Sequence, residues 1–94
     1  MKHKKITIFG KVQGIGYRKW LQSFCNKNKI SGWVANHKNG YVIAHVLVFD
    51  DTQLQELTTH CLIGPNHANI TNIDICDSSK IIKDEKFIIK NLKS

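Results

Sequence analysis

KKITIFGKVQGIGYRKWLQSFC, residues 4–25, passes from one hydrophobic pattern to another through a glycine-rich turn. Its first part, residues 4–10, alternates polar and apolar side chains and places Ile6 and Ile8 on one side, which predicts a strand. Beyond the turn, apolar side chains recur at the spacing of one helical face, which predicts a helix of about three turns. This apolar stripe comprises Tyr17, Trp20, Leu21, Phe24 and Cys25.

The next part of the chain predicts a β-hairpin. Residues 32–36 and 41–49 are both rich in residue types that favour strands. The sequence HKNG lies between them, and its Asn39-Gly40 pair suits the positive φ angles of a tight hairpin turn. We therefore expect two antiparallel strands joined by this turn.

The stretch DDTQLQELTTHCLIG, residues 50–64, predicts a second helix. Asp50 stands three residues before Gln53, which is the spacing of a capping box, and Gly64-Pro65 ends the helical pattern. The side chains expected to be buried are Leu54, Leu57, Cys61 and, beside it, Leu62.

Two further strands are expected in the last third of the chain. Residues 68–76 carry apolar side chains that change phase midway, which indicates a strand with a bulge or bend near Asn72. A short final strand over residues 87–90 directs Phe87 and Ile89 inward, and no element is predicted for residues 78–86.

The first six predicted elements follow the order β-α-β-β-α-β, which places an antiparallel hairpin between two crossover helices, and the short final strand comes after them. This is the order of the α+β, ferredoxin-like split βαβ sandwich, in which an antiparallel sheet carries two helices on one face. The fold hosts many activities, so the function has to be argued from particular residues.

The composition is that of one globular domain, 1–94, because 94 residues build a single modest core. Neither the 41 % hydrophobic nor the 22 % charged fraction suggests disorder. Three cysteines without a C-x-x-C pair argue against a disulfide framework and predict reduced, buried thiols. Too few apolar residues follow the basic N-terminus to form a signal peptide or a membrane span, so we expect a cytoplasmic protein.

The net charge of +7 is compatible with three properties: binding of nucleic acid, binding of small anions, or a solvated lysine-rich surface. The lysines are spread along the chain, which favours the solvated surface. Only one of the 14 basic residues, Arg18, is an arginine, and it follows a loop with three of the six glycines.

A glycine-rich turn before a helix is suited to binding an anion. It lets successive backbone N–H groups point into one concavity, and the helix N-terminus adds positive charge there. Arg18 lies in the first helical turn, where its planar guanidinium can hold two phosphate oxygens at once. The candidate backbone donors are Gln13, Gly14, Ile15, Gly16, Tyr17 and Arg18.

Residues 10–18, GKVQGIGYR, closely resemble the acylphosphatase family signature G-x-V-Q-G-V-x-[FY]-R. SGWVANHKNGYV, residues 31–42, is similar to that family's G-W-V-x-N-x-x-D-G-x-V, and IGPNHANI, residues 63–70, to its G-P-x-x-A-x-V segment. Residues 87–89 match a terminal F-x-I, so the resemblance covers nearly the whole chain. The departures are conservative, namely Ile15, Tyr17 and Asn39 at positions where the family usually has valine, phenylalanine and aspartate.

This resemblance implies hydrolysis of small acyl phosphates, with Arg18 binding the substrate phosphate and Asn36 orienting the attacking water. The backbone amides of residues 13–18 would complete the phosphate cradle. It implies no cofactor and no metal. Inorganic phosphate or sulfate is expected to bind as product or analogue. No nucleic acid and no membrane is expected as a partner, and a monomer suffices.

Hydrolysis of an acyl phosphate requires few catalytic side chains. Its leaving group is a carboxylate with a pKa of roughly 4, which departs without being protonated, so no general acid is required. What remains is to neutralise the phosphoryl oxygens and to hold a water in line with the breaking bond. The chain accordingly lacks metalloprotease, C-x-x-C and Ser-His-Asp signatures, and its five histidines share no metal-ligand spacing. His37, beside Asn36, is expected at the surface or the rim of the pocket.

Two other functions remain open. The RNA-recognition motif has the same element order, and KNGYVIAHV, residues 38–46, faintly echoes one of its signatures, although without the later aromatic residues. The second alternative is a regulatory or carbamoyl-phosphate-handling module, like the acylphosphatase-like segments of larger proteins.

Overall fold

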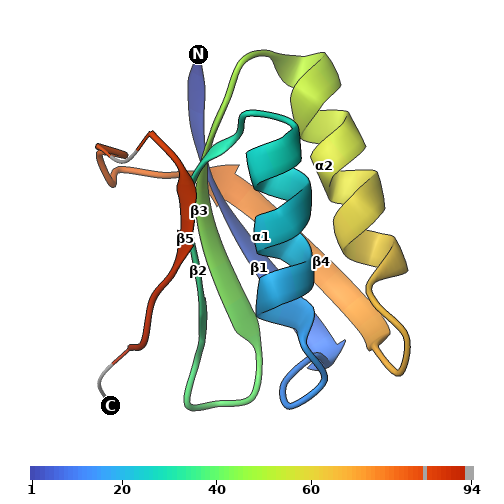
Figure 1. Cartoon of the computed structure of the whole chain (residues 1–94). Helices are drawn as coiled ribbons and strands as arrows, with labels where there is room; N and C mark the ends of the chain where they lie inside the picture. The colour runs from blue at the N-terminus through green and yellow to red at the C-terminus, as the bar shows by residue number, and fades with distance from the viewer. Residues whose placement is uncertain (84, 93–94) are drawn as a thin grey trace.

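The computed structural model describes residues 1–83 and 85–92 and shows the predicted succession of strands and helices (Figure 1). Five strands and two helices follow one another along the chain: β1 (Lys2–Lys11), α1 (Tyr17–Lys27), β2 (Ser31–Asn36), β3 (Val42–Val48), α2 (Asp51–Ile63), β4 (Asn69–Asp77) and β5 (Phe87–Ile89). Within these residues, no helix is both long and apolar enough to cross a membrane.

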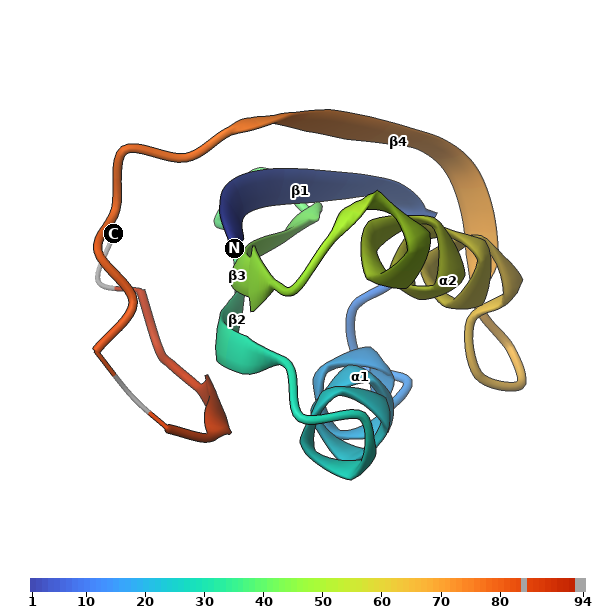
Figure 2. The same cartoon turned by 90° about the horizontal axis from the view of Figure 1, so that it is seen from above.

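The strands form one sheet in the order β4-β1-β3-β2-β5. The first four are antiparallel to their neighbours, as the split βαβ fold requires, whereas β5 pairs parallel to β2. The sheet is therefore mixed, and the predicted antiparallel arrangement holds for four of its five strands. The chain after β4 crosses to the opposite edge of the sheet (Figure 2), and β5 then runs opposite to β4 and in the direction of β2.

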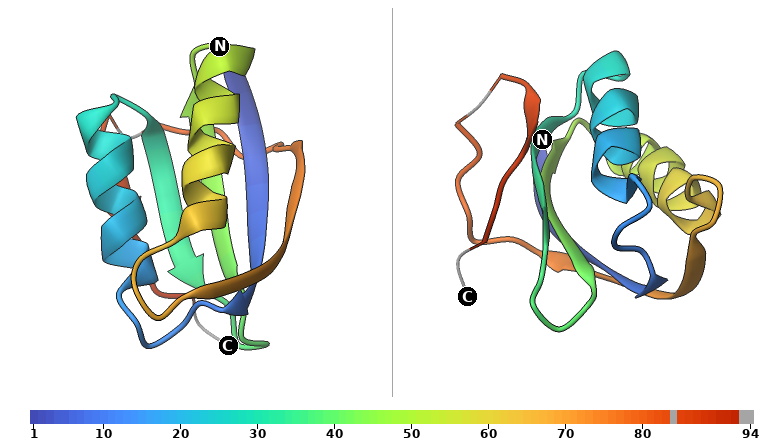
Figure 3. Two further views of the ribbon diagram at one scale, coloured as in Figure 1. Left: turned by 90° about the vertical axis from the view of Figure 1, so that its right-hand side faces the viewer. Right: turned by 60° about the horizontal axis from the view of Figure 1, so that its bottom comes forward.

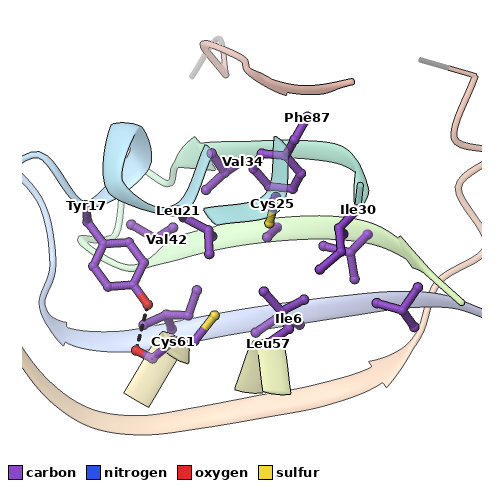
Figure 4. Close-up of a cluster of buried hydrophobic side chains, with 14 of the residues drawn as sticks. Ile6, Tyr17, Leu21, Cys25, Ile30, Val34, Val42, Leu57, Cys61 and Phe87 are labelled. Atoms are coloured by element: carbon purple, nitrogen blue, oxygen red, sulfur yellow. Dashed lines mark hydrogen bonds between the residues drawn. The ribbon is translucent and has the colours of Figure 1, made fainter. Parts of the chain in front are cut away.

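Both helices pack on the same face of the sheet (Figure 3). The core lies between them, because alternate strand residues such as Ile6, Ile8 and Val34 point toward the helices and are fully buried. Figure 4 shows this layer, in which Leu21 and Cys25 of α1 meet Leu57 and Cys61 of α2 and the aliphatic side chains of the sheet. The predicted inward positions of β5 are confirmed, since Phe87 is buried and Ile89 packs against the core.

The predicted irregularity near Asn72 is a β-bulge between β1 and β4. Phe9 pairs with Asn72, but the next residue, Gly10, pairs with Ile70, so Thr71 is the extra residue. The phase change lets apolar residues on both sides of the bulge, Ile70 and Ile73, pack against the core.

The predicted cap of α2 is also present. The Asp50 side chain accepts a hydrogen bond of 2.9 Å from the backbone N–H of Gln53. The Gln53 side chain reaches back one residue further than in a standard capping box and accepts from the backbone N–H of Phe49 at 2.6 Å.

Two burial predictions are wrong. Leu62 is 53 % exposed, because Leu57 and Cys61 occupy the centre of the buried stripe of α2 and Leu62 is turned away from it. Cys76 is exposed, whereas Cys25 and Cys61 are buried as expected. Cys76 pairs with Lys5 on β1, and both project from the sheet face opposite the helices.

Candidate active site

The turn between β1 and α1 depends on two glycines. Gly14 and Gly16 have φ angles of 75° and 83°, in the left-handed region that glycine adopts without strain. No atom would obstruct a Cβ at either position, so the requirement is conformational rather than one of space. Gly16 caps α1, and its carbonyl accepts the first helical hydrogen bond, from the backbone N–H of Trp20 at 3.0 Å.

This turn presents unused hydrogen-bond donors. Among the described residues, no backbone N–H of residues 13–18 donates a hydrogen bond to another backbone group. Arg18 lies in the first turn of α1 and is half-buried. Two ion pairs are found among the described residues, and Arg18 takes part in neither. Donors of this kind, next to a helix N-terminus, favour an anionic ligand.

Arg18 and Asn36 line the same cavity, which has a volume of about 200 Å³. They come from different elements, Arg18 from α1 and Asn36 from the end of β2. The Asn36 Oδ1 atom is buried and has no hydrogen-bond partner, so the hydrogen-bonding capacity of this acceptor is unused. The full lining is Val12, Gly14, Gly16, Tyr17, Arg18, Lys19, Asn36 and Ile89.

Tyr17 lines this cavity, and its hydroxyl makes a hydrogen bond within the fold. The side chain is fully buried, and its O–H donates to the backbone carbonyl of Cys61 at 2.8 Å (Figure 4). Burial raises the pKa of the Tyr17 phenol well above its ordinary value of 10.0. The hydroxyl therefore stays protonated and joins α1 to α2.

Two of the predicted cradle residues direct their side chains elsewhere. Neither Gln13 nor Ile15 lines the cavity: Ile15 packs against the core, and the Gln13 side chain donates to two backbone carbonyls of the β2–β3 turn. Their predicted contribution is through backbone N–H groups, and it stays a prediction. Three further residues line the cavity without having been predicted to, namely Val12, Lys19 and Ile89. Val12 and Ile89 are apolar residues of family motifs, which do not distinguish pocket from core, and Lys19 is one of many lysines.

The histidines do not form a metal site. Within residues 1–83 and 85–92, no group of three or more His, Cys, Asp or Glu side chains could hold a metal ion. His37 is half-buried near the cavity and stacks on Tyr41, with ring centroids 4.3 Å apart. His60 stacks between the Trp20 and Phe24 rings of α1, at centroid distances of 4.0 and 3.9 Å.

The fold and this cavity define an α+β sandwich with a small basic pocket where its first strand turns into its first helix. The acylphosphatase family model matches residues 4–89, which includes every residue that lines the cavity. The chain belongs to the acylphosphatase family of hydrolases.

Individual relatives agree with this assignment. An acylphosphatase of Rhodopseudomonas palustris (strain BisB5) is 33 % identical over 70 residues, covering 74 % of this chain and 70 % of the relative. One from Syntrophus aciditrophicus is 31 % identical over 96 residues, covering 92 % and 97 %. The crystal structure of acylphosphatase from Bacillus subtilis superposes with a TM-score of 0.86 at 28 % identity, covering 96 % of this chain and 99 % of that one.

Proposed function

We propose that this protein hydrolyses the carboxyl–phosphate anhydride of small acyl phosphates to a carboxylate and inorganic phosphate. One observation carries the proposal: Arg18, two glycines of the turn and Asn36 line a single small cavity, and the carbonyl oxygen of Asn36 has no hydrogen-bond partner. The family supplies the reaction class, and these groups supply what the reaction needs.

The phosphoryl end of the substrate is held by charge and by oriented donors. The Arg18 guanidinium binds two phosphoryl oxygens, and the free backbone N–H groups of residues 13–18 bind the others. These donors are in place before the substrate arrives, so they stabilise the charge of the transition state without reorganising.

Asn36 orients the water. Its buried Oδ1 atom accepts a hydrogen bond from the attacking water, which fixes the direction of the water lone pair toward phosphorus. The water oxygen bonds to phosphorus as the bond from phosphorus to the acyl oxygen breaks, and the carboxylate leaves with the electron pair. The water protons pass to the phosphate product and to solvent, so no strong base, metal ion or cofactor takes part.

We further propose that the protein acts as a monomer in the cytoplasm. Arg18, Asn36 and the glycine turn, which are the groups that the proposed reaction needs, line one cavity within a single protomer, so the mechanism needs no second copy. The cysteines are free thiols, two of them buried, which suits a reducing compartment.

Hydrolysis of benzoyl phosphate in the presence of EDTA tests the proposal. We expect chelator-resistant turnover by the wild type and a loss of about 100- to 1,000-fold in Arg18→Ala and in Asn36→Ala, the scale of removing one oxyanion donor. Full activity in either variant would contradict the role given to that residue. No turnover by the wild type, together with salt-sensitive RNA binding, would instead favour the RNA-binding alternative.

The geometry of Arg18 is tested by moving its guanidinium. Arg18→Lys keeps the charge but loses the bidentate fork, so we expect activity close to that of Arg18→Ala. The double variant Arg18→Lys, Lys19→Arg has the wild-type composition and charge, yet it shifts the guanidinium about 100° around α1. It should stay impaired, and recovered activity would mean that a guanidinium at position 19, which also lines the cavity, can replace that of Arg18.

A further inference from the structure

We infer that Gln13 is a positioning residue that sets the distance between the phosphate cradle and the water-orienting Asn36. The inference rests on the proposed function. Gln13 belongs to the turn after β1, whereas Asn36 ends β2, and these two segments lie at the same end of the molecule (Figures 1 and 3). The Gln13 side chain connects them directly.

The connection consists of two hydrogen bonds from one amide group. The Gln13 Nε2 atom donates to the backbone carbonyls of His37 at 2.7 Å and Tyr41 at 3.0 Å, and the side chain is partly buried. Because both partners are acceptors, the orientation of the amide is determined: its NH₂ group faces the turn. We refer to this pair of bonds as the Gln13 tether.

The tether joins the loop to a turn that is already closed by its own bonds. The backbone N–H of Gly40 donates to the His37 carbonyl at 3.0 Å, and that of His37 donates to the Tyr41 carbonyl at 2.8 Å. The Tyr41 ring stacks on His37 and contacts Phe9 of β1, with a ring-centroid distance of 5.2 Å to Phe9. Both carbonyls therefore keep a partner without Gln13, and the tether is not required to close the turn.

The Gln13 tether instead affects the geometry of the cavity. Asn36 directly precedes His37, and the two neighbours of Gln13 in the loop, Val12 and Gly14, line the same cavity as Asn36. In-line attack depends on where the water stands relative to the phosphoryl group, and a displacement of about 1 Å is enough to cost about 100-fold in rate. The tether fixes that separation.

Gln13→Met tests the inference, since it keeps the length of the side chain and removes both hydrogen bonds. We expect kcat for benzoyl phosphate to fall about 10- to 100-fold. The inhibition constant of inorganic phosphate should hardly change, because the phosphate is bound by the loop and Arg18, which belong to one continuous segment. The melting temperature should also hardly change, because both carbonyls keep a backbone donor.

Gln22→Met is the matched control. The Gln22 Nε2 atom also donates to a backbone carbonyl, that of Phe87 at 3.2 Å, and that carbonyl keeps a second donor in Asn26 at 3.2 Å. The substitution is the same and the lost bond is of the same kind, but it lies between α1 and β5. We expect wild-type kcat from this variant.

Gln13→Glu adds a readout that a purely structural role would not produce. As a carboxylate it places two acceptors against two carbonyl oxygens, whereas the protonated acid has one O–H donor and restores one bond. The ratio of its kcat to that of the wild type should therefore rise as the pH falls from about 7 to about 4.5, close to the ordinary pKa of a glutamate.

The possible outcomes separate this inference from the proposed function. If the wild type turns over and Arg18→Ala does not, but Gln13→Met keeps the wild-type kcat, the tether inference is overturned alone. The same holds if Gln13→Met and Gln22→Met lose activity equally, or if the Gln13→Met loss follows a lower melting temperature. Absence of turnover in the wild type overturns both.

Discussion

The hydroxyl of Tyr17 replaces a hydrogen bond that the backbone of α2 cannot make. The carbonyl of Cys61 would ordinarily accept from the residue four positions later, but that residue is Pro65, which has no N–H. The Tyr17 O–H donates to this carbonyl instead, at 2.8 Å. A residue next to Arg18 thus secures the C-terminal end of α2, and the walls of the cavity are tied to the second helix.

Tyr17→Phe should separate stability from catalysis. The variant keeps the buried ring but leaves the Cys61 carbonyl without its donor, so we expect a loss of about 1–3 kcal/mol in the free energy of unfolding. Urea denaturation measures this loss, and kcat for benzoyl phosphate should stay near the wild-type value. An unchanged unfolding free energy would show that water replaces the hydroxyl.

Among the elements, α2 depends on a single glutamine at its N-terminus. Gln53 accepts from the backbone N–H of Phe49 after β3 and donates from Nε2 to the carbonyl of Asn28 after α1, at 3.0 Å. Its own backbone N–H is bound by Asp50. One side chain therefore joins the ends of three elements on the side of the molecule away from the cavity.

Gln53→Ala should consequently cost more than an ordinary helix substitution. It leaves the Phe49 N–H and the Asn28 carbonyl without this partner, and because these groups are exposed and partly buried, we expect a loss of about 0.5–1.5 kcal/mol in the free energy of unfolding. Gln55→Ala, on the exposed side of the same helix, is the control and should change stability by less than about 0.5 kcal/mol. Equal losses by urea denaturation would mean that the junction contributes nothing beyond helix propensity.

The elements were predictable wherever a few neighbouring residues decide the outcome. The alternation of Ile6 and Ile8 and the spacing of Asp50 and Gln53 are local signals, and both predictions are confirmed. The parallel pairing of β5 was not predictable, because it depends on where the segment after β4 crosses the sheet. Exposure of Leu62 likewise depends on which flank of the stripe meets the sheet.

The candidate site likewise has features that the sequence predicts and features that it does not. The residues alone indicated an anion pocket at the glycine turn, and family resemblance added Asn36. The Gln13 tether joins residues 24 and 28 positions apart, and no local pattern records such a contact. Strand pairing likewise decides which way Trp33 faces: it lies beside His45 on the sheet face away from the helices, under the Lys90 ammonium.

The stability of the whole molecule depends more on the burial of neutral groups than on charges at the surface. The net charge is +7, and the two ion pairs in the described residues, Lys2–Asp51 and Lys4–Asp77, are exposed, so each adds little stability. Burial raises the pKa of the Cys61 thiol to about 12 and shifts those of Cys25 and Tyr17 upward in the same way. The free energy of unfolding should therefore fall as the pH becomes alkaline.

Two histidines, His45 and His60, should reduce the stability of the fold at acidic pH. Burial lowers the pKa of His45, and nearby Lys5, Lys80 and Lys90 lower it further, while burial alone lowers the pKa of His60. The unfolded chain takes up a proton near the ordinary pKa of 6.5 before the folded protein does. Stability from these two residues is therefore present above that pH and is lost as the pH falls below it.

The loss of stability at alkaline pH is the easier of the two to test, because three buried groups contribute to it. Above the ordinary pKa values of 9.0 for the thiols and 10.0 for the phenol, the unfolded chain loses protons that the folded protein keeps. The stability contributed by these three groups is thus complete below pH 9 and falls as the pH rises, by about 1.4 kcal/mol per pH unit for each group once it ionises in the unfolded chain. Urea denaturation from pH 7 to pH 11 (about one-unit steps, under reductant) measures this slope.

Tyr17→Phe isolates the phenol within that slope. Below pH 10 the variant should be less stable than the wild type by a constant amount, because it lacks only the hydrogen bond to Cys61. Above pH 10 the wild type alone must keep a buried phenol protonated, so its stability falls more steeply and the difference between the two proteins shrinks. A difference that stays constant to pH 11 would mean that the Tyr17 hydroxyl ionises as readily in the fold as in the unfolded chain, and it would contradict the buried position that ties the cavity wall to α2.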